Sequence, residues 1–336
     1  MNSQKAKEKQ AQFLKKIEDV LPKNTSLVNE LSEVLELSTD SAYRRMRLET
    51  FLSIEEILTL CEHFNISFDA FESTDAGVVN FNYTHMAPKR ESFMEYLEKL
   101  VTELQIINKS KEKQIIYACE DIPIFHHYEH PVLASFKMFY WMHSIMSIPE
   151  LEHIKFDSNY RSEEFEILGN KIAESYKNIP SIEIWTETTI QSTIKQIEYF
   201  LDSGKFKSTN DALAVCNALR DEILVIQKQA EKGSKFLDNE NSDKSDHYQL
   251  YFSEVEITNN CVYVNIGSLK SVYLGHFTFS TMSTFSESYC KETFYWLNNI
   301  IKKSILISGV SEKQRYQVFN KYFKTIDALK TKIENS

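Results

Sequence analysis

Residues 31–47 of the chain read LSEVLELSTDSAYRRMR, and the sequence on either side is organised around them. Leu31, Val34 and Leu35 continue an apolar spacing of three and four residues that starts at residues 27 and 28, which predicts a helix. The spacing stops at Leu37, and the hydroxyl of Ser38 can accept the first free N–H groups of a new helix. The stretch therefore predicts two short helices joined by a tight turn.

The second of these helices, from Thr39 to about Leu48, has two different faces. Ala42 and Met46 are four residues apart and can face inward. The other side chains are mostly polar or basic and are left for solvent or a partner: Asp40, Ser41, Tyr43, Arg44, Arg45 and Arg47. A helix of this kind, following another helix and a tight turn, is typical of a helix-turn-helix.

The flanking sequence supplies helices that would support this motif. Residues 4–21 have an apolar face and end before Pro22, which predicts a first helix. Ser53 and Glu56 form a capping box that begins another helix through Phe64. Ser67 can cap one more short helix within residues 66–71, and the small, polar residues 73–77 predict a domain boundary.

With these elements, residues 1–75 resemble the phage-repressor (XRE-type) helix-turn-helix family, which has five short helices in this order. Residues 31–38 match its second helix and turn, and residues 66–71 match its ending. Ser32 and Glu36 stand where the family usually has Ala and Gly, and the third helix is about one residue longer. The resemblance implies an all-α domain over residues 1–76 that binds double-stranded DNA as a homodimer on a palindromic site.

The resemblance and the motif together predict that the third helix enters the major groove. The expected DNA-contacting residues are Thr39, Asp40, Ser41, Tyr43, Arg44, Arg45 and Arg47. The two adjacent arginines are expected to contact guanine or phosphate, and the peptide N–H groups near Thr39 can bind a phosphate.

The charge of this domain supports a second hypothesis. Residues 1–76 contain 9 Lys and Arg against 14 Asp and Glu, a net charge of −5, whereas affinity for DNA comes largely from Lys and Arg. An acidic domain can bind DNA if its negative face points away from the duplex. Alternatively, the domain is a protein-interaction module that docks a partner protein.

Residues 77–110 are expected to form a connecting segment. An apolar stripe spaced by four and three residues predicts one helix in it; its members are Phe93, Leu97, Leu100, Leu104 and Ile107. Such a stripe either pairs two copies of the chain or packs the helix on its own domain, and two heptads do not decide between these alternatives.

Residues 111–336 alternate between helical and strand patterns and predict an α+β sensor or dimerisation domain. Strands are expected at residues 114–119, 248–257, 261–266 and 272–281, with a hairpin turn at Asn259-Asn260. Helices are expected at about residues 131–146, 160–177, 186–202, 209–231, 286–303 and 311–332, and residues 232–247 are expected to form a polar loop. The predicted fold class is therefore mainly α with a small antiparallel sheet.

The densest set of candidate ligand-binding residues follows the first of these strands. His126 and His130 are four residues apart, a spacing that on a helix could bind a metal ion. Pro131 disfavours a helix there, so a polar loop or the rim of a pocket is expected in place of a metal site. A pocket for a small-molecule or peptide effector is expected at His126, His127, His130, Trp141 and Trp185. Signature motifs of enzymes and glycine-rich phosphate loops are missing, so neither enzymatic activity nor a cofactor is expected.

Composition sets the remaining limits. The 336 residues are enough for two domains, and 42% hydrophobic with 26% charged residues is ordinary for a globular protein. The first nine residues are polar, and the apolar run at residues 136–146 is too short to cross a bilayer. Five dispersed cysteines indicate reduced thiols. The sequence thus predicts a cytoplasmic transcription regulator with no membrane partner.

Overall fold

The computed structural model of the protein describes residues 2–21, 25–64, 66, 78–237, 247–277 and 279–336. It contains two compact units, Met1–Asn80 and Phe81–Ser336. Each unit has its own hydrophobic core, so each is described by itself. The predicted short helix from Ser67 and the predicted boundary at residues 73–77 lie outside the described residues.

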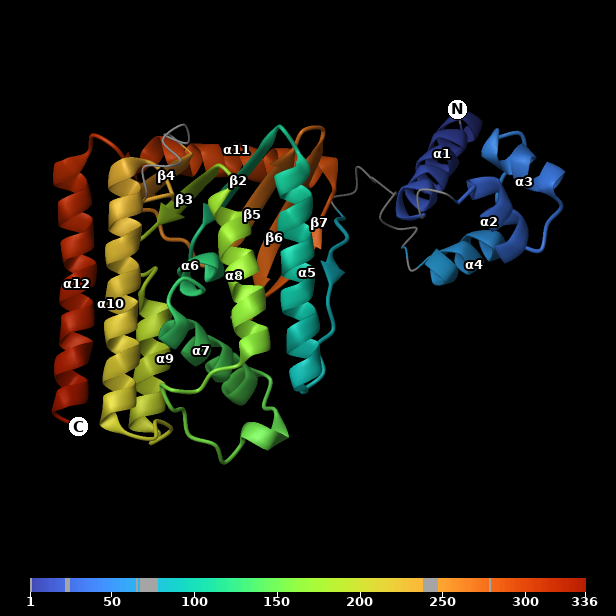
Figure 1. Ribbon diagram of the computed structural model, residues 1–336. Helices are drawn as coiled ribbons and strands as arrows, with labels where there is room; N and C mark the ends of the chain where they lie inside the picture. The colour runs from blue at the N-terminus through green and yellow to red at the C-terminus, as the bar shows by residue number, and fades with distance from the viewer. Residues whose placement is uncertain (1, 22–24, 65, 67–77, 238–246, 278) are drawn as a thin grey trace. The chain divides into compact units, whose positions relative to one another are not determined.

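The first unit contains helices α1 (Asn2–Val20), α2 (Leu27–Val34), α3 (Thr39–Met46) and α4 (Ile54–Phe64) (Figure 1). Its core includes Leu31 of α2 and Ala42 of α3, which agrees with the apolar spacing of the sequence. The predicted helix start at Ser38 is confirmed, since its hydroxyl accepts the N–H of Ser41. The predicted capping box is confirmed too: Glu56 N–H donates to Ser53 Oγ, and Ser53 N–H donates to Glu56 Oε2.

The second unit is built on one eight-stranded sheet with the strand order β1-β7-β6-β5-β2-β3-β4-β8. The strands are β1 (Asn82–Tyr83), β2 (Lys113–Ala118), β3 (Ser181–Trp185), β4 (Tyr248–Phe252), β5 (Cys261–Ile266), β6 (Leu269–His276), β7 (Ser280–Thr284) and β8 (Ile305–Leu306). β2, β3 and β4 pair in parallel, and the other neighbours pair antiparallel. Parallel neighbours need long crossover connections, which the helices between these strands supply.

Helices cover both faces of this sheet (Figure 1). The longer helices are α5 (Arg90–Lys109), α7 (Pro131–Tyr140), α8 (Glu163–Lys177), α9 (Gln191–Asp202), α10 (Thr209–Lys232), α11 (Glu287–Lys303) and α12 (Glu312–Glu334), and short helices are α6 (Ile124–His127), a π-turn at Trp141–Ile145 and a 3-10 turn at Pro149–Leu151. Alternate residues of β2 point to opposite faces: Ile115 and Tyr117 join the large core, while Ile116 and Ala118 join a smaller core with α11.

The prediction of a small antiparallel sheet is wrong, because the sheet is mixed and has eight strands. Asn259-Asn260 does not close a hairpin of the flanking strands, since β4 pairs with β3 and β8 while β5 pairs with β2 and β6. The predicted strand at residues 272–281 is divided between β6 and β7. The five residues of β3 carry too short a pattern to stand out between two helices, and without them the parallel centre of the sheet is missed.

Helix α5 packs on its own unit. The side chains that it buries in the large core are Phe93, Leu97, Val101, Leu104 and Ile107, and α5 lies against α8. The apolar stripe of α5 is therefore buried by packing within its own unit, and not by pairing with a second copy of the chain. Among the described helices, none is both long enough and apolar enough to span a bilayer.

Candidate functional site

The turn between α2 and α3 has the hydrogen bonds of a helix end that reverses direction. Leu37 N–H donates to Ser32 O at 2.9 Å, and Glu36 N–H donates to Glu33 O. Glu36 itself has φ +53°, the left-handed conformation that usually requires glycine. A glutamate at this glycine-like position keeps the tight turn, at the cost of backbone strain.

The exposed face of α3 carries the residues that the sequence assigns to DNA. Asp40, Tyr43, Arg44 and Arg47 are exposed, and they lie three, four and seven residues from the first of them, so they form one stripe along the helix. The guanidinium of Arg47 lies 5.5 Å from the centre of the Tyr43 ring. This stripe of four residues is called the α3 face below. Thr39 is exposed at its N-terminal end, and Ser41 is half-buried beside it.

Arg45, the other arginine assigned to DNA, is turned into the domain. Its Nε donates to Glu56 Oε2 at 3.1 Å, its Nη2 pairs with the other oxygen of Glu56, and its Nη1 donates to Ser41 O. Burial raises the pKa of Glu56, but hydrogen bonds from Arg45 and from Ser53 N–H outweigh burial and hold it below its ordinary value. Arg45 therefore joins α3 to α4 and is not free to contact a base.

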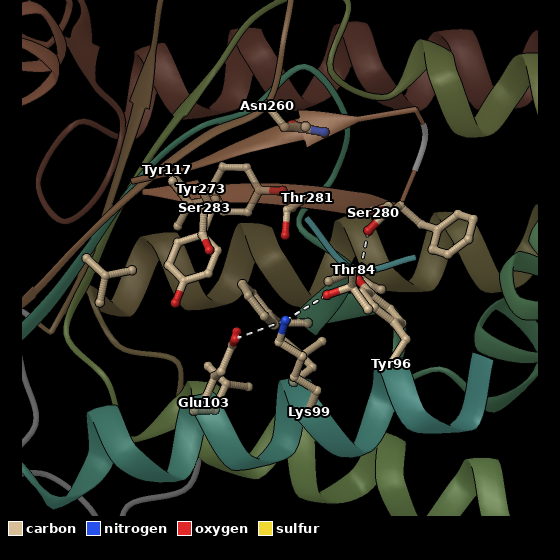
Figure 2. Close-up of a pocket in the computed structure, with 18 of the residues that line it drawn as sticks. Thr84, Tyr96, Lys99, Glu103, Tyr117, Asn260, Tyr273, Ser280, Thr281 and Ser283 are labelled. Carbon is tan, nitrogen blue, oxygen red and sulfur yellow. Dashed lines mark hydrogen bonds and ion pairs between the residues drawn. The ribbon is translucent and has the colours of Figure 1, made fainter. Parts of the chain in front are cut away.

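A cavity of about 110 Å³ lies in the second unit, between helix α5 and the antiparallel half of the sheet (Figure 2). By the same measure one water molecule needs only about 10–15 Å³, so the cavity has room for several waters or for a small organic molecule. One wall is α5, with Tyr96, Lys99 and Glu103; the opposite wall is made by β5, β6 and β7 and includes Tyr273 and Thr281.

The polar groups of α5 point towards the sheet across this cavity (Figure 2). Lys99 Nζ donates to Thr84 Oγ1 at 2.7 Å and lies 4.0 Å from Glu103 Oε1. Burial raises the pKa of Glu103, and Lys99 offsets this only in part. The Tyr96 hydroxyl donates a hydrogen bond to Phe279 O at 2.7 Å, which holds the residue before β7 against α5.

Of the residues that the sequence assigns to a pocket, His127 and Trp141 line this cavity. The Trp141 indole is 2% exposed, and its N–H has no acceptor among the described residues. His127 Nδ1 pairs with Glu222 Oε1 at 2.8 Å. His126, His130 and Trp185 are not among the lining residues, so the histidine cluster does not form one site.

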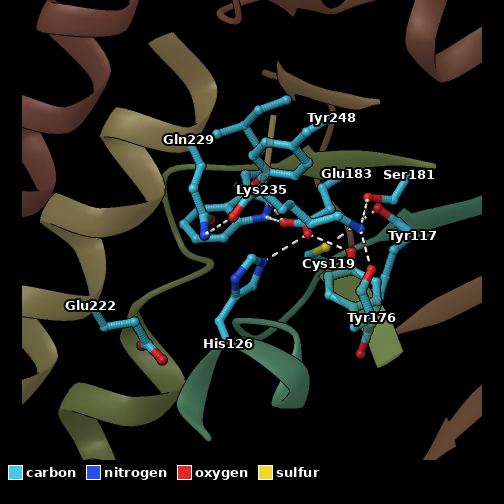
Figure 3. A network of polar contacts seen from close by, with 12 residues as sticks. Tyr117, Cys119, His126, Tyr176, Ser181, Glu183, Glu222, Gln229, Lys235 and Tyr248 are labelled. Carbon is cyan, nitrogen blue, oxygen red and sulfur yellow. Dashed lines mark hydrogen bonds and ion pairs between the residues drawn. The ribbon is translucent and has the colours of Figure 1, made fainter. Parts of the chain in front are cut away.

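His126 and Trp185 instead belong to a buried network around Glu183. Figure 3 shows His126 pointing towards the Glu183 carboxylate. The Glu183 carboxylate accepts hydrogen bonds from His126 Nε2 at 2.8 Å and Trp185 Nε1 at 2.8 Å, and from the hydroxyls of Tyr176 and Tyr248. Burial raises the pKa of Glu183, but His126 and the other donors outweigh burial and lower it. Every partner is buried, so this network stabilises the core and offers no open site.

Lys235 completes the buried network beside Tyr176. Its ammonium donates to the carbonyls of Tyr176 and Ile179 and to Ser181 Oγ, at 2.6–2.8 Å. Burial lowers the pKa of Lys235 to about 7, although the nearby Glu183 favours the charged form. Among the described residues, no three His, Cys, Asp or Glu side chains form a group that could hold a metal ion.

The main cavity residues escape sequence reasoning. Lys99 and Glu103 look like an ordinary i, i+4 pair on the polar face of an amphipathic helix. Tyr273 and Thr281 lie more than 160 residues further along the chain. Comparison of the chain with protein-family models, with curated proteins and with solved structures found no match.

Proposed function

We propose that the protein is a sequence-specific DNA-binding transcription regulator. The observation that carries the proposal is the α3 face, where Arg44 and Arg47 are exposed on the second helix of a helix-turn-helix while Arg45 is held inside. A short helix with exposed arginines fits the major groove, where arginine can donate two hydrogen bonds to guanine.

In this function the residues of α3 divide into two groups. Thr39 and Asp40 at the N-terminal end would approach base edges, and Arg44 and Arg47 would contact guanine or phosphate. Tyr43 stacks under Arg47 and would restrict its rotamers before DNA binds. One such helix reads few base pairs, so we propose a homodimer on a two-fold symmetric site.

The second unit would then sense an effector or hold the dimer together. A DNA-binding head joined to a larger body with a cavity is the layout of a one-component regulator, and this step rests on analogy. The cavity supplies a place for an effector.

A second candidate function, docking of a partner protein by the first unit, is favoured by another surface. Phe51, Ile54 and Leu58 are 47%, 80% and 58% exposed, and two of them lie four residues apart on α4. Exposed apolar side chains on a domain with a net charge of −5 suit a protein partner better than a phosphate backbone.

Selection from random duplexes distinguishes the two functions. The full chain is incubated with the pool at low and moderate salt, and bound duplexes are sequenced. Enrichment of an inverted repeat is expected, with Arg44→Ala weakening binding to it by about 1–3 kcal/mol. Lys5→Ala is the matched control, because it removes one exposed positive charge of the same unit from α1 and leaves the α3 face intact.

A pool that stays unenriched at low salt would reject DNA binding and leave the docking function. Equal weakening by Arg44→Ala and Lys5→Ala would show that net charge, and not the α3 face, governs binding.

A further inference from the structure

The cavity of the second unit contains two opposite charges side by side. Lys99 and Glu103 lie one turn apart on α5, and both side chains point from the helix towards the sheet (Figure 2). Their 4.0 Å separation is at the limit of an ion pair, and the structure records no hydrogen bond between them. Each charge therefore keeps capacity for a further partner of opposite sign.

Glu103 is the less compensated of the two. Its side chain is 31% exposed, against 51% for Lys99. Its carboxylate is partly removed from water, and Lys99 is the cation beside it among the residues that the structure describes. Lys99, in contrast, donates a short hydrogen bond to Thr84. A ligand ammonium would complete the pairing of Glu103, and a ligand carboxylate would complete that of Lys99.

The rest of the cavity is largely apolar. Leu100, Leu104 and Ile107 line it from α5, and Val262 and Val264 line it from β5. Thr281 and Ser283 on β7 line the same cavity, and their hydroxyl groups can bond the polar end of a ligand. A molecule of opposite charges at one end and a hydrocarbon group at the other matches this distribution.

We propose that the cavity binds a free α-amino acid with an apolar side chain. The ammonium would pair with Glu103, the carboxylate with Lys99, and the side chain would lie against the leucine, isoleucine and valine residues of α5 and β5. A simple amine would pair with Glu103 but be repelled by Lys99, and a simple carboxylate would pair with Lys99 but be repelled by Glu103. The zwitterion is therefore the preferred ligand.

The site also has a direct connection to the chain that leads to the first unit. Thr84, which accepts the hydrogen bond of Lys99, follows β1, and β1 begins two residues after the first unit ends at Asn80. β1 is exposed and pairs with β7 over only two residues, Asn82 with Ser283 and Tyr83 with Met282. The Lys99 ammonium has three N–H donors, so a ligand carboxylate can bind it while Thr84 is still bonded. The carboxylate is the stronger acceptor, so it would draw the ammonium towards itself, lengthen the bond to Thr84 and loosen β1.

Binding is tested by calorimetry on the full chain without DNA, using three matched probes. L-leucine carries both charges, 3-methylbutylamine lacks the carboxylate, and 4-methylpentanoate lacks the ammonium. Leucine is expected to bind about 10- to 100-fold more tightly than either analogue, as loss of one charge-assisted hydrogen bond implies. L-valine and L-phenylalanine test whether another apolar side chain fits better.

Variants assign the contacts. Glu103→Gln is expected to weaken leucine binding at least 10-fold and to abolish its advantage over 4-methylpentanoate, and Lys99→Met to abolish its advantage over 3-methylbutylamine. Glu98→Gln is the control, because Glu98 is exposed on the same helix and does not line the cavity. The proposal is overturned if no amino acid binds, if an analogue binds as tightly as leucine, or if Glu103→Gln matches Glu98→Gln.

The regulatory consequence rests on the proposed DNA-binding function, whereas the site does not. Hydrogen exchange of residues 81–86 is expected to become faster when leucine is bound, and the affinity for the selected duplex to change with it. Binding with the expected selectivity but without any effect on DNA affinity would leave the amino acid site standing and reject its role in regulation.

Discussion

Replacing each of two adjacent arginines of α3 tests how the first unit is held together. Arg45 contributes hydrogen bonds to both oxygens of Glu56 and to Ser41 O, whereas Arg44 is exposed. Arg45→Ala is expected to destabilise the first unit, because it removes these bonds and leaves the Glu56 carboxylate without its cation. Arg44→Ala removes the same side chain from a neighbouring position and serves as the matched control.

The size of the effect follows from how far this pair is buried. The Arg45 and Glu56 side chains are 15% and 17% exposed, between the exposed pairs worth about 0.2–1 kcal/mol and the buried pairs whose disruption costs about 3–5 kcal/mol. Because Ser53 N–H still bonds Glu56 after the substitution, we expect a loss of about 2 kcal/mol. The exposed Arg44 should change stability by less than about 0.5 kcal/mol.

Hydrogen exchange of the full chain measures this locally. Amides of α3 and α4 that exchange through unfolding of the first unit should exchange about 30-fold faster in Arg45→Ala, since 1.4 kcal/mol corresponds to a factor of ten. Amides of β2 and β3 in the second unit should be unchanged, which provides an internal reference. Equal protection of α3 in the two variants would refute the assignment of Arg45 to the interior and Arg44 to the surface.

Three further predictions also use hydrogen exchange of the full chain. Here the protein is exchanged briefly at a series of urea concentrations, and the urea midpoint of each unit reports its stability. Glu36→Gly should stabilise the first unit by about 0.5–1 kcal/mol, because relief of the left-handed strain exceeds the entropy cost of glycine; a loss of stability would contradict the strained turn. The lowered pKa of Glu56 means that its stabilisation is complete above its unfolded-state pKa of about 4.3 and is lost as the pH falls through the lower folded value; Glu56→Gln should reduce this acid sensitivity, and an unchanged slope would reject the cause. Glu183→Gln should destabilise the second unit by about 3–5 kcal/mol while α3 stays protected, because its four buried donors lose their charged acceptor; a loss below about 1 kcal/mol would show that the network contributes little.

Much of the first unit could be predicted because its signals are local. The Ser38 cap, the Ser53 and Glu56 capping box and the inward position of Ala42 each depend on residues within four positions along the chain. The exposure of the α3 face follows from the same spacing. The residues next to Arg45 in the sequence do not show that it faces the interior, because its partner Glu56 lies eleven residues away on another helix. The sequence therefore predicted Arg45 as a DNA contact.

The sheet of the second unit was predicted less well, for a related reason. The strands that alternate strongly were found, but their neighbours were not, since β5 and β2 pair across more than 140 residues. Adjacent strands in the sequence look like a hairpin, and only the long crossovers through helices place β4 beside β3.

The sequence by itself determined the helical spacing of the first unit, the caps that begin α3 and α4, and the exposure of the α3 face. Backbone capping and apolar periodicity act over one or two turns, so a linear reading captures them. Only the tertiary structure decided that Arg45 binds Glu56, that β2, β3 and β4 form a parallel centre, and that Lys99 and Glu103 face Thr281 across a cavity. The contact of Arg45 depends on packing of α3 and α4 on the core of the first unit. The contacts of the second unit join residues far apart in the chain, and they form only when burial of the large core brings α5 and the sheet together.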